Sequence, residues 1–97
     1  MAIQLAESEH HFIKQTLIKM LPNAKFYVFG SRAKGTARQY SDLDILVITE
    51  EAIPLSTLSA LGEAFSESNL PFKVDIVDWH RITPEFRENI NREQVEL

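Results

Sequence analysis

The chain has 97 residues, of which 44% are hydrophobic and 25% are charged, with a formal net charge of −4 and no cysteine. This length and composition predict a single globular domain over residues 1–97, and the missing cysteines exclude disulfides and thiolate chemistry. No run of residues approaches the roughly 18 apolar positions of a membrane-spanning helix, which excludes an integral membrane protein.

Residues 6–21 are predicted to form the first helix, because apolar side chains recur at three- and four-residue spacing until Pro22 ends the pattern. The residues before it lack the basic and apolar regions of a signal peptide, so we expect a cytoplasmic protein. His10 and His11 are neighbours on this helix and point in different directions, so we expect both to lie on the surface.

Short strands follow. Residues 25–29 are rich in aromatic side chains and predict a strand, and residues 32–34 predict a short helical turn after Gly30. Residues 43–49 are apolar at nearly every position, which indicates a central strand of the sheet.

The second half of the chain predicts a helix over residues 55–68, a strand over 72–77 and a last helix that begins after Thr83 and ends near Gln94. We expect Phe86 and Ile90 to face inward on the last helix, and the side chains on another of its faces to be free, namely Arg87, Asn91 and Gln94. Trp79 either covers the core or contacts a partner, and His80 is expected on the surface.

The order of these elements is α-β-α-β-α-β-α, which predicts an α+β (α/β-like) fold. We expect a small mixed β-sheet of three or slightly more strands with flanking helices.

Charge is distributed unevenly along the chain. Residues 10–41 hold six basic and no acidic side chains, whereas residues 42–97 hold four basic and twelve acidic ones. A basic segment that ends beside two aspartates suggests a small anion and a metal cation held side by side, although solvated charged faces would give the same pattern. The overall acidity argues against a nucleic-acid partner.

Three aspartates are candidates for one site. Asp42 and Asp44 lie two residues apart at the start of a predicted strand and so point to the same side. Asp75, in a later strand, would join them if the two strands are neighbours, and Asp78, three residues on, is its competitor on the opposite face. Three carboxylates together repel one another, so they favour a hard divalent ion such as Mg²⁺ or Mn²⁺.

Gly30 and Ser31 follow a strand and precede a helical turn. Backbone N–H groups at such a turn, together with a serine hydroxyl, can bind an anion, with Arg32, Lys34 and Arg38 within reach. Taken alone, the Gly-Ser pair could equally be an ordinary turn.

The combination is more specific than its parts. Gly30-Ser31, ten further residues that end in Ser41, then Asp42-Leu43-Asp44 and an isolated Asp75 in a later strand form a pattern that resembles the nucleotidyltransferases of the DNA polymerase β superfamily, and more closely the minimal nucleotidyltransferases (MNT domains) of bacteria. The resemblance covers nearly the whole chain and shows no departure at the motif positions.

This resemblance implies the nucleotidyltransferase fold and a role for each motif residue. Gly30 and Ser31 would hold the β- and γ-phosphates of a nucleoside triphosphate such as ATP. Asp42 and Asp44 would bind two Mg²⁺ ions, and Asp75 would bind the catalytic ion and help to activate an acceptor hydroxyl. Cations such as Arg32 or Lys34 would meet the charge on the phosphates.

The resemblance also implies a partner. Larger relatives carry a further helical domain that binds the acceptor, so we expect this chain to share its acceptor site with a helical HEPN-type protein. Three functions stay open: an antitoxin that adenylylates its partner, an enzyme that nucleotidylates a small molecule with a helical subunit, and a binding partner without catalysis. Nothing in the sequence separates the first two.

Overall fold

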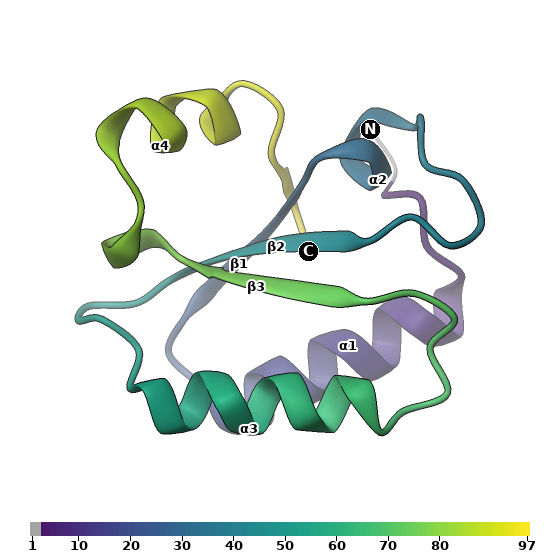
Figure 1. Ribbon diagram of the computed structural model, residues 1–97, viewed down its shortest axis with the longest axis horizontal. Coiled ribbons are helices and arrows are strands. Elements are labelled where there is room, and N and C mark those ends of the chain that lie inside the picture. Colours follow the sequence, from purple (N-terminus) through teal and green to yellow (C-terminus); the bar gives the residue numbers. More distant parts are fainter. Residues whose placement is uncertain (1–2) are drawn as a thin grey trace.

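Helices lie on both sides of a central sheet in this structure, a computed structural model that describes residues 3–97 (Figure 1). Helices α1 (Glu7–Met20) and α3 (Leu55–Ser66) cover one face, and α4 (Pro84–Asn91) and the short α2 (Ser31–Lys34) lie on the other side. No helix within residues 3–97 is long and apolar enough to cross a membrane.

The sheet has four strands in the order β3-β2-β1-β4. Strand β1 (Lys25–Phe29) pairs antiparallel with β2 (Leu43–Ile48) and with β4 (Val95–Glu96), and β2 runs parallel to β3 (Val74–Asp78). A parallel pair needs a crossover connection, which α3 provides here. The sheet is therefore mixed, as the order of elements predicted.

Every predicted helix and strand is present, with ends that shift by a few residues. The predicted strand over residues 72–77 begins at Val74 and ends at Asp78. Two short elements were not predicted: β4, and a 3-10 turn, η1 (Trp79–Arg81).

Strand β2 divides its side chains between two apolar clusters. Leu43, Ile45 and Val47 point to the larger cluster, which α1 and α3 share, and Leu46 points to a smaller one with Phe29 and Ile90. Because side chains alternate along a strand, Asp44 lies on the face of Leu46, which is the face that α4 partly covers. The periodicity of the strand thus brings a carboxylate to the less covered side of the sheet.

The prediction for the faces of the last helix was partly wrong. Ile90 is buried as expected, but Phe86 is 40% exposed and touches only the edge of the Phe29 ring. Arg87 is not free: its guanidinium lies 3.7 Å from the centre of the Trp79 ring and donates a hydrogen bond to the Trp79 carbonyl oxygen. Trp79 therefore packs within the fold, as the first of its two readings proposed.

Two histidines that were expected on the surface are half-buried instead. His10 Nε2 lies 2.9 Å from the carbonyl oxygen of Leu97, and His80 Nε2 lies 2.6 Å from that of Thr49. Both contacts join residues that are far apart in sequence, so helical periodicity and local sequence could not indicate them. His11 is exposed, as predicted.

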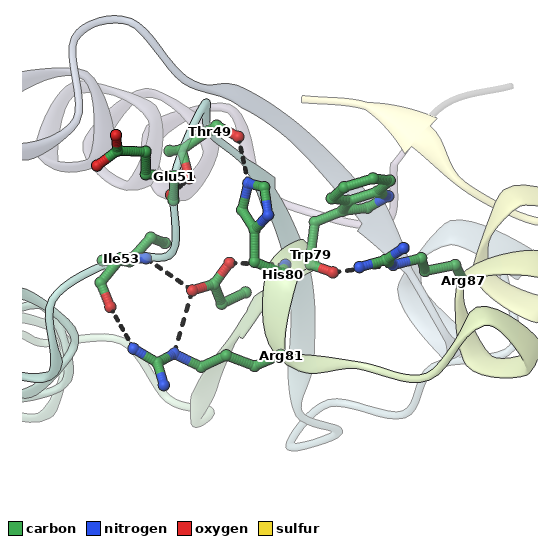
Figure 2. A network of polar contacts seen from close by, with 8 residues as sticks. Thr49, Glu51, Ile53, Trp79, His80, Arg81 and Arg87 are labelled. Atoms are coloured by element: carbon green, nitrogen blue, oxygen red, sulfur yellow. Dashed lines mark hydrogen bonds and ion pairs between the residues drawn. The ribbon is translucent and has the colours of Figure 1, made fainter.

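The loop between β2 and α3 is fixed by a carboxylate at the end of β3. Asp78 is 4% exposed and accepts hydrogen bonds from the backbone N–H groups of Ile53, at 2.7 Å, and His80, at 2.9 Å. Figure 2 shows Arg81 closing this network, with its guanidinium between the Ile53 carbonyl oxygen and the same carboxylate. Asp78 thus has a structural role at the end of the sheet.

Candidate active site

The parallel pairing of β2 and β3 brings two of the three candidate carboxylates together. Asp44 and Asp75 are direct partners in the register of the two strands, on the face that α4 partly covers. Asp42 lies two residues before Asp44, just ahead of β2, and is exposed to solvent. The condition set by the sequence, that the two strands be neighbours, is met.

Asp44 is the carboxylate with the least favourable surroundings. Partial burial raises its pKa, and repulsion from the carboxylates of Asp75, Asp42 and Glu93 raises this pKa further. A concentration of negative charge of this kind favours a bound cation over a bare cluster of acids.

The structure also separates Asp75 from its competitor. The Asp75 side chain is 39% exposed and, among residues 3–97, forms an ion pair only with Lys73, at 3.4 Å. Asp78 is buried, and its oxygens already accept from the backbone and from Arg81. Asp75 is thus the one of the two that can reach a ligand, while its role in catalysis stays a prediction.

Gly30 lies so close to Asp44 that a side chain at position 30 would displace the Asp44 carboxylate. Its φ of 77° and ψ of −156° lie in a region that is essentially restricted to glycine, and a Cβ atom built there would be 2.5 Å from Asp44 Oδ2. The backbone of the Gly-Ser turn consequently lies directly against the carboxylates.

Ser31 is the first residue of α2 and is half-buried. The first N–H groups of a helix have no partner within the helix, so they are available to an anion or to water. The turn and the carboxylates therefore form two adjacent parts of one site, a donor-rich part and an acidic part.

The sequence analysis missed Glu93, which lies between α4 and β4. Its Oε1 accepts a hydrogen bond from the Gly30 N–H at 3.0 Å, and its Oε2 lies 2.9 Å from Lys34 Nζ. These contacts, led by the hydrogen bond from Lys34, lower the pKa of Glu93 against the opposing effect of burial. Glu93 is 63 residues from Gly30 in the sequence, so local motifs could not predict this contact.

Arg32 does not take the place predicted for it beside a phosphate. Its side chain is buried, and its guanidinium donates hydrogen bonds to four backbone carbonyl oxygens while stacking 4.1 Å from the centre of the Phe72 ring. The four acceptors are Gln4, Arg38, Gln39 and Ser41. In this arrangement Arg32 holds the loop that leads into Asp42, and of the two predicted phosphate cations Lys34 remains beside Gly30.

The acidic part of the site suits a hard divalent cation, because every candidate metal ligand there is a carboxylate oxygen. Within residues 3–97, no three His, Cys, Asp or Glu side chains are grouped closely enough to hold a metal ion as they stand. A bound cation would have to draw the carboxylates together, and the repulsion on Asp44 is the force that it would relieve.

Comparison with known proteins agrees with this geometry. Residues 11–97 match the model of the family described as "Polymerase beta, Nucleotidyltransferase". A relative from Haemophilus influenzae named "Probable protein adenylyltransferase MntA" is 40% identical over 90 residues, which are 93% of this chain and 79% of the relative.

Two solved structures extend the likeness to the fold. A structure of a minimal nucleotidyltransferase is 35% identical, with a TM-score of 0.73 over 94% of each chain. A chain in the crystal structure of a mutant toxin-antitoxin MntA-HpeT is 27% identical, with a TM-score of 0.76 over 97% of this chain and 72% of that one. The four-stranded mixed sheet with flanking helices is thus the fold of these proteins.

Proposed function

Because this chain belongs to the polymerase beta nucleotidyltransferase family and is a nucleotidyltransferase, we propose that it transfers AMP from ATP to a hydroxyl group of a helical HEPN-type partner protein. The observation that carries the proposal is the pairing of Asp44 with Asp75 directly against the backbone of Gly30. This pairing supports the proposal because it brings acidic side chains next to the backbone of the Gly30-Ser31 turn, and metal-assisted in-line transfer at a phosphorus atom uses carboxylates and phosphate-binding groups side by side.

Each residue has a defined task in this proposal. The Gly30-Ser31 turn binds the β- and γ-phosphates through backbone N–H groups and the serine hydroxyl, and Lys34 neutralises part of their charge. Asp42 and Asp44 would hold two Mg²⁺ ions, with Asp75 a ligand of one of them. When bound, these ions would supply charge neutralisation at the attacking and leaving oxygens.

The transfer step exchanges one bond for another at the α-phosphorus. The acceptor oxygen forms a bond to this phosphorus while the bond to the bridging oxygen of pyrophosphate breaks. The hydroxyl proton leaves toward solvent with the help of Asp75, which lies half-exposed at the edge of the site. The products are an AMP ester of the acceptor and pyrophosphate.

A protein acceptor is supported by the relatives. The Haemophilus relative is named as a protein adenylyltransferase, and a chain of similar fold and 27% identity occurs in a toxin-antitoxin. On this basis we propose that the biological role is that of an antitoxin that modifies its partner.

ATP labelled at either the α- or the γ-phosphorus tests the reaction class. The tagged protein is purified with whatever chain accompanies it and incubated with each labelled ATP and Mg²⁺. We expect the α-label to become covalently attached to the accompanying protein, and the γ-label to leave in pyrophosphate. Attachment of the γ-label would contradict nucleotidyl transfer.

The same experiment separates the alternatives for the acceptor. Transfer of the α-label only after addition of a small hydroxylated compound would indicate a small-molecule nucleotidyltransferase. No transfer to any acceptor, with the complex intact, would leave only a binding role. Asp42→Asn is the control, because a contaminating enzyme would be unaffected by it.

A further inference from the structure

Glu93 provides a carboxylate to the same donors that the proposed function gives to the phosphates. The Gly30 N–H and the Lys34 ammonium each bind one of its two oxygens, at 3.0 and 2.9 Å. We propose that this contact is autoinhibitory: Glu93 occupies the phosphate site of the nucleotide-free chain, and the triphosphate has to displace it. The inference rests on the proposed function, because it takes Gly30 and Lys34 to be phosphate donors.

The position of Glu93 follows from the register of the sheet. Strand β4 pairs antiparallel with β1, with Val95 opposite Val28 and Glu96 opposite Tyr27. The same register continued by two residues sets Glu93 opposite Gly30, where β1 has ended and the turn into α2 begins. The fold thus brings Glu93 beside the turn, and its side chain completes the contact.

The chemistry of the contact resembles that of a bound phosphate. A carboxylate, like a phosphate, presents two oxygens to hydrogen-bond donors, and bonds from a backbone N–H and an ammonium to an anion are charge-assisted. An intramolecular carboxylate on such donors competes with any anion from solution.

The contact is built to be displaced. The Lys34 side chain is 53% exposed and the Glu93 side chain 27% exposed, so water screens their attraction. Glu93 also adds to the repulsion that raises the pKa of Asp44. The contact therefore stabilises one end of the site while it disfavours the ionised carboxylate at the other end, and a cation-bound triphosphate would relieve this conflict.

The consequence is a reduced affinity for nucleotide. The apparent affinity of a protein is its intrinsic affinity multiplied by the fraction of molecules that are competent to bind, and Glu93 lowers this fraction. For a screened, partly exposed contact we expect a reduction of about three- to tenfold.

Glu93→Ala and Glu93→Gln test the proposal, with Glu88→Gln as the matched control. Glu88 is 70% exposed and pairs only with Arg92 on the surface of the same segment, so its substitution removes the same charge away from the site. Binding of a non-hydrolysable ATP analogue with Mg²⁺ is measured by calorimetry in all four proteins. Thermal unfolding confirms that each variant is folded.

We expect Glu93→Ala to bind the analogue about three- to tenfold more tightly than wild type and Glu88→Gln. The affinity of Glu93→Gln for the analogue should lie between those of wild type and Glu93→Ala, because its amide oxygen can still accept a hydrogen bond from the Gly30 N–H. In a Lys34→Gln background the gain from Glu93→Ala should shrink, because the two residues act through one contact.

Other outcomes separate the inference from the function beneath it. If wild type binds the analogue and Glu93→Ala binds it no more tightly than Glu88→Gln, the inference that the Glu93 contact is autoinhibitory is wrong, and the proposed function stands. Weaker binding by Glu93→Ala would overturn the inference by making Glu93 a part of the binding site. If no folded variant binds the analogue, the proposed function fails and the inference fails with it.

Discussion

At the scale of residues, Asp44 combines a proposed role in the site with a cost in stability. Burial and three neighbouring carboxylates all raise its pKa. The Asp44 side chain therefore ionises less readily in the folded protein than in the unfolded chain. A group with a raised folded pKa contributes stability that is present at low pH and is lost as the pH rises through that pKa. In the absence of a cation, ionised Asp44 therefore destabilises the fold near neutral pH.

We predict that Asp44→Asn raises the unfolding temperature of the metal-free protein near neutral pH, by the equivalent of less than about 1 kcal/mol. The advantage should disappear as the pH falls through the raised pKa of Asp44, because the wild-type side chain then becomes neutral as well. Thermal unfolding followed across this range measures the difference. A loss of more than about 2 kcal/mol near neutral pH would indicate that Asp44 has a structural hydrogen-bonding role instead.

Gly30 and Gly35 provide a matched pair for the close approach at the site. Both have a φ of 77°, but a Cβ atom at Gly30 would meet Asp44 and one at Gly35 would meet nothing within 4 Å. We predict that Gly30→Ala reduces the free energy of unfolding by about 1–3 kcal/mol more than Gly35→Ala does, and also abolishes nucleotide binding. Urea unfolding and calorimetry measure the two effects, and equal effects at the two glycines would refute the close contact.

Arg32 tests whether a buried cation supports the loop or binds phosphate. Lysine keeps the charge but cannot make several planar hydrogen bonds and a stacking contact at once. We predict that Arg32→Lys costs about 1–3 kcal/mol of stability, whereas Arg38→Lys, at an exposed position, costs less than about 0.5 kcal/mol. Unchanged stability with a large loss of nucleotide affinity would support the role that the sequence first suggested for Arg32.

At the scale of elements, one of the two aspartates of β3 has a structural role and the other faces the proposed site. Asp78 ties the end of the strand to the loop before α3 and to η1, whereas Asp75 faces Asp44 across the pair of parallel strands. We predict that Asp78→Asn lowers stability by about 2–4 kcal/mol and that the molecules still folded bind nucleotide normally. Asp75→Asn should leave stability within about 0.5 kcal/mol of wild type and abolish transfer. A large loss of stability in Asp75→Asn, together with a loss of transfer in a stable Asp78→Asn, would contradict this division of roles.

The sequence was sufficient to predict the main helices and strands, but not the long-range contacts between them. Periodicity and the positions of proline and glycine predicted every main helix and strand. The alternation of side chains along the strands predicted that Asp44 and Asp75 share a face if their two strands are neighbours. Phe72 was included in a strand because it is apolar, yet its ring packs under Arg32 just before β3 begins. Strand β4 has two residues and no local signal, because only its pairing with β1 makes it a strand.

Long-range contacts also explain why the sequence did not indicate the positions of Arg32 and Glu93. Arg32 lies among other cations in the sequence and gave no sign that four backbone carbonyl oxygens would surround its guanidinium. Glu93 reaches Gly30 only through the register of β4 with β1, which is a long-range property. Local patterns could therefore identify candidate residues for the site, but not that the fold would bury the Arg32 side chain or bring Glu93 to Gly30.

At the scale of the whole molecule, the two faces of the sheet have different tasks. Helices α1 and α3 bury the larger apolar cluster on one face, and this cluster holds β2 and β3 in register. On the other face α4 contributes Ile90 to the smaller cluster around Leu46, and Asp44 and Asp75 are paired on the same face of the sheet. The core thus supports a charged site that it does not enclose, and in our proposal the nucleotide and the acceptor bind on this side of the sheet.

The intact mass of the accompanying partner protein, measured after co-expression with this chain, tests the central claim most directly. With the wild-type chain we predict that the partner carries one or more AMP units, and that Asp42→Asn and Asp44→Asn, although folded and still bound to the partner, leave it unmodified. A partner of unmodified mass with the wild-type chain, or one equally modified with either variant, would contradict an AMP-transfer site built on Asp42, Asp44 and Asp75.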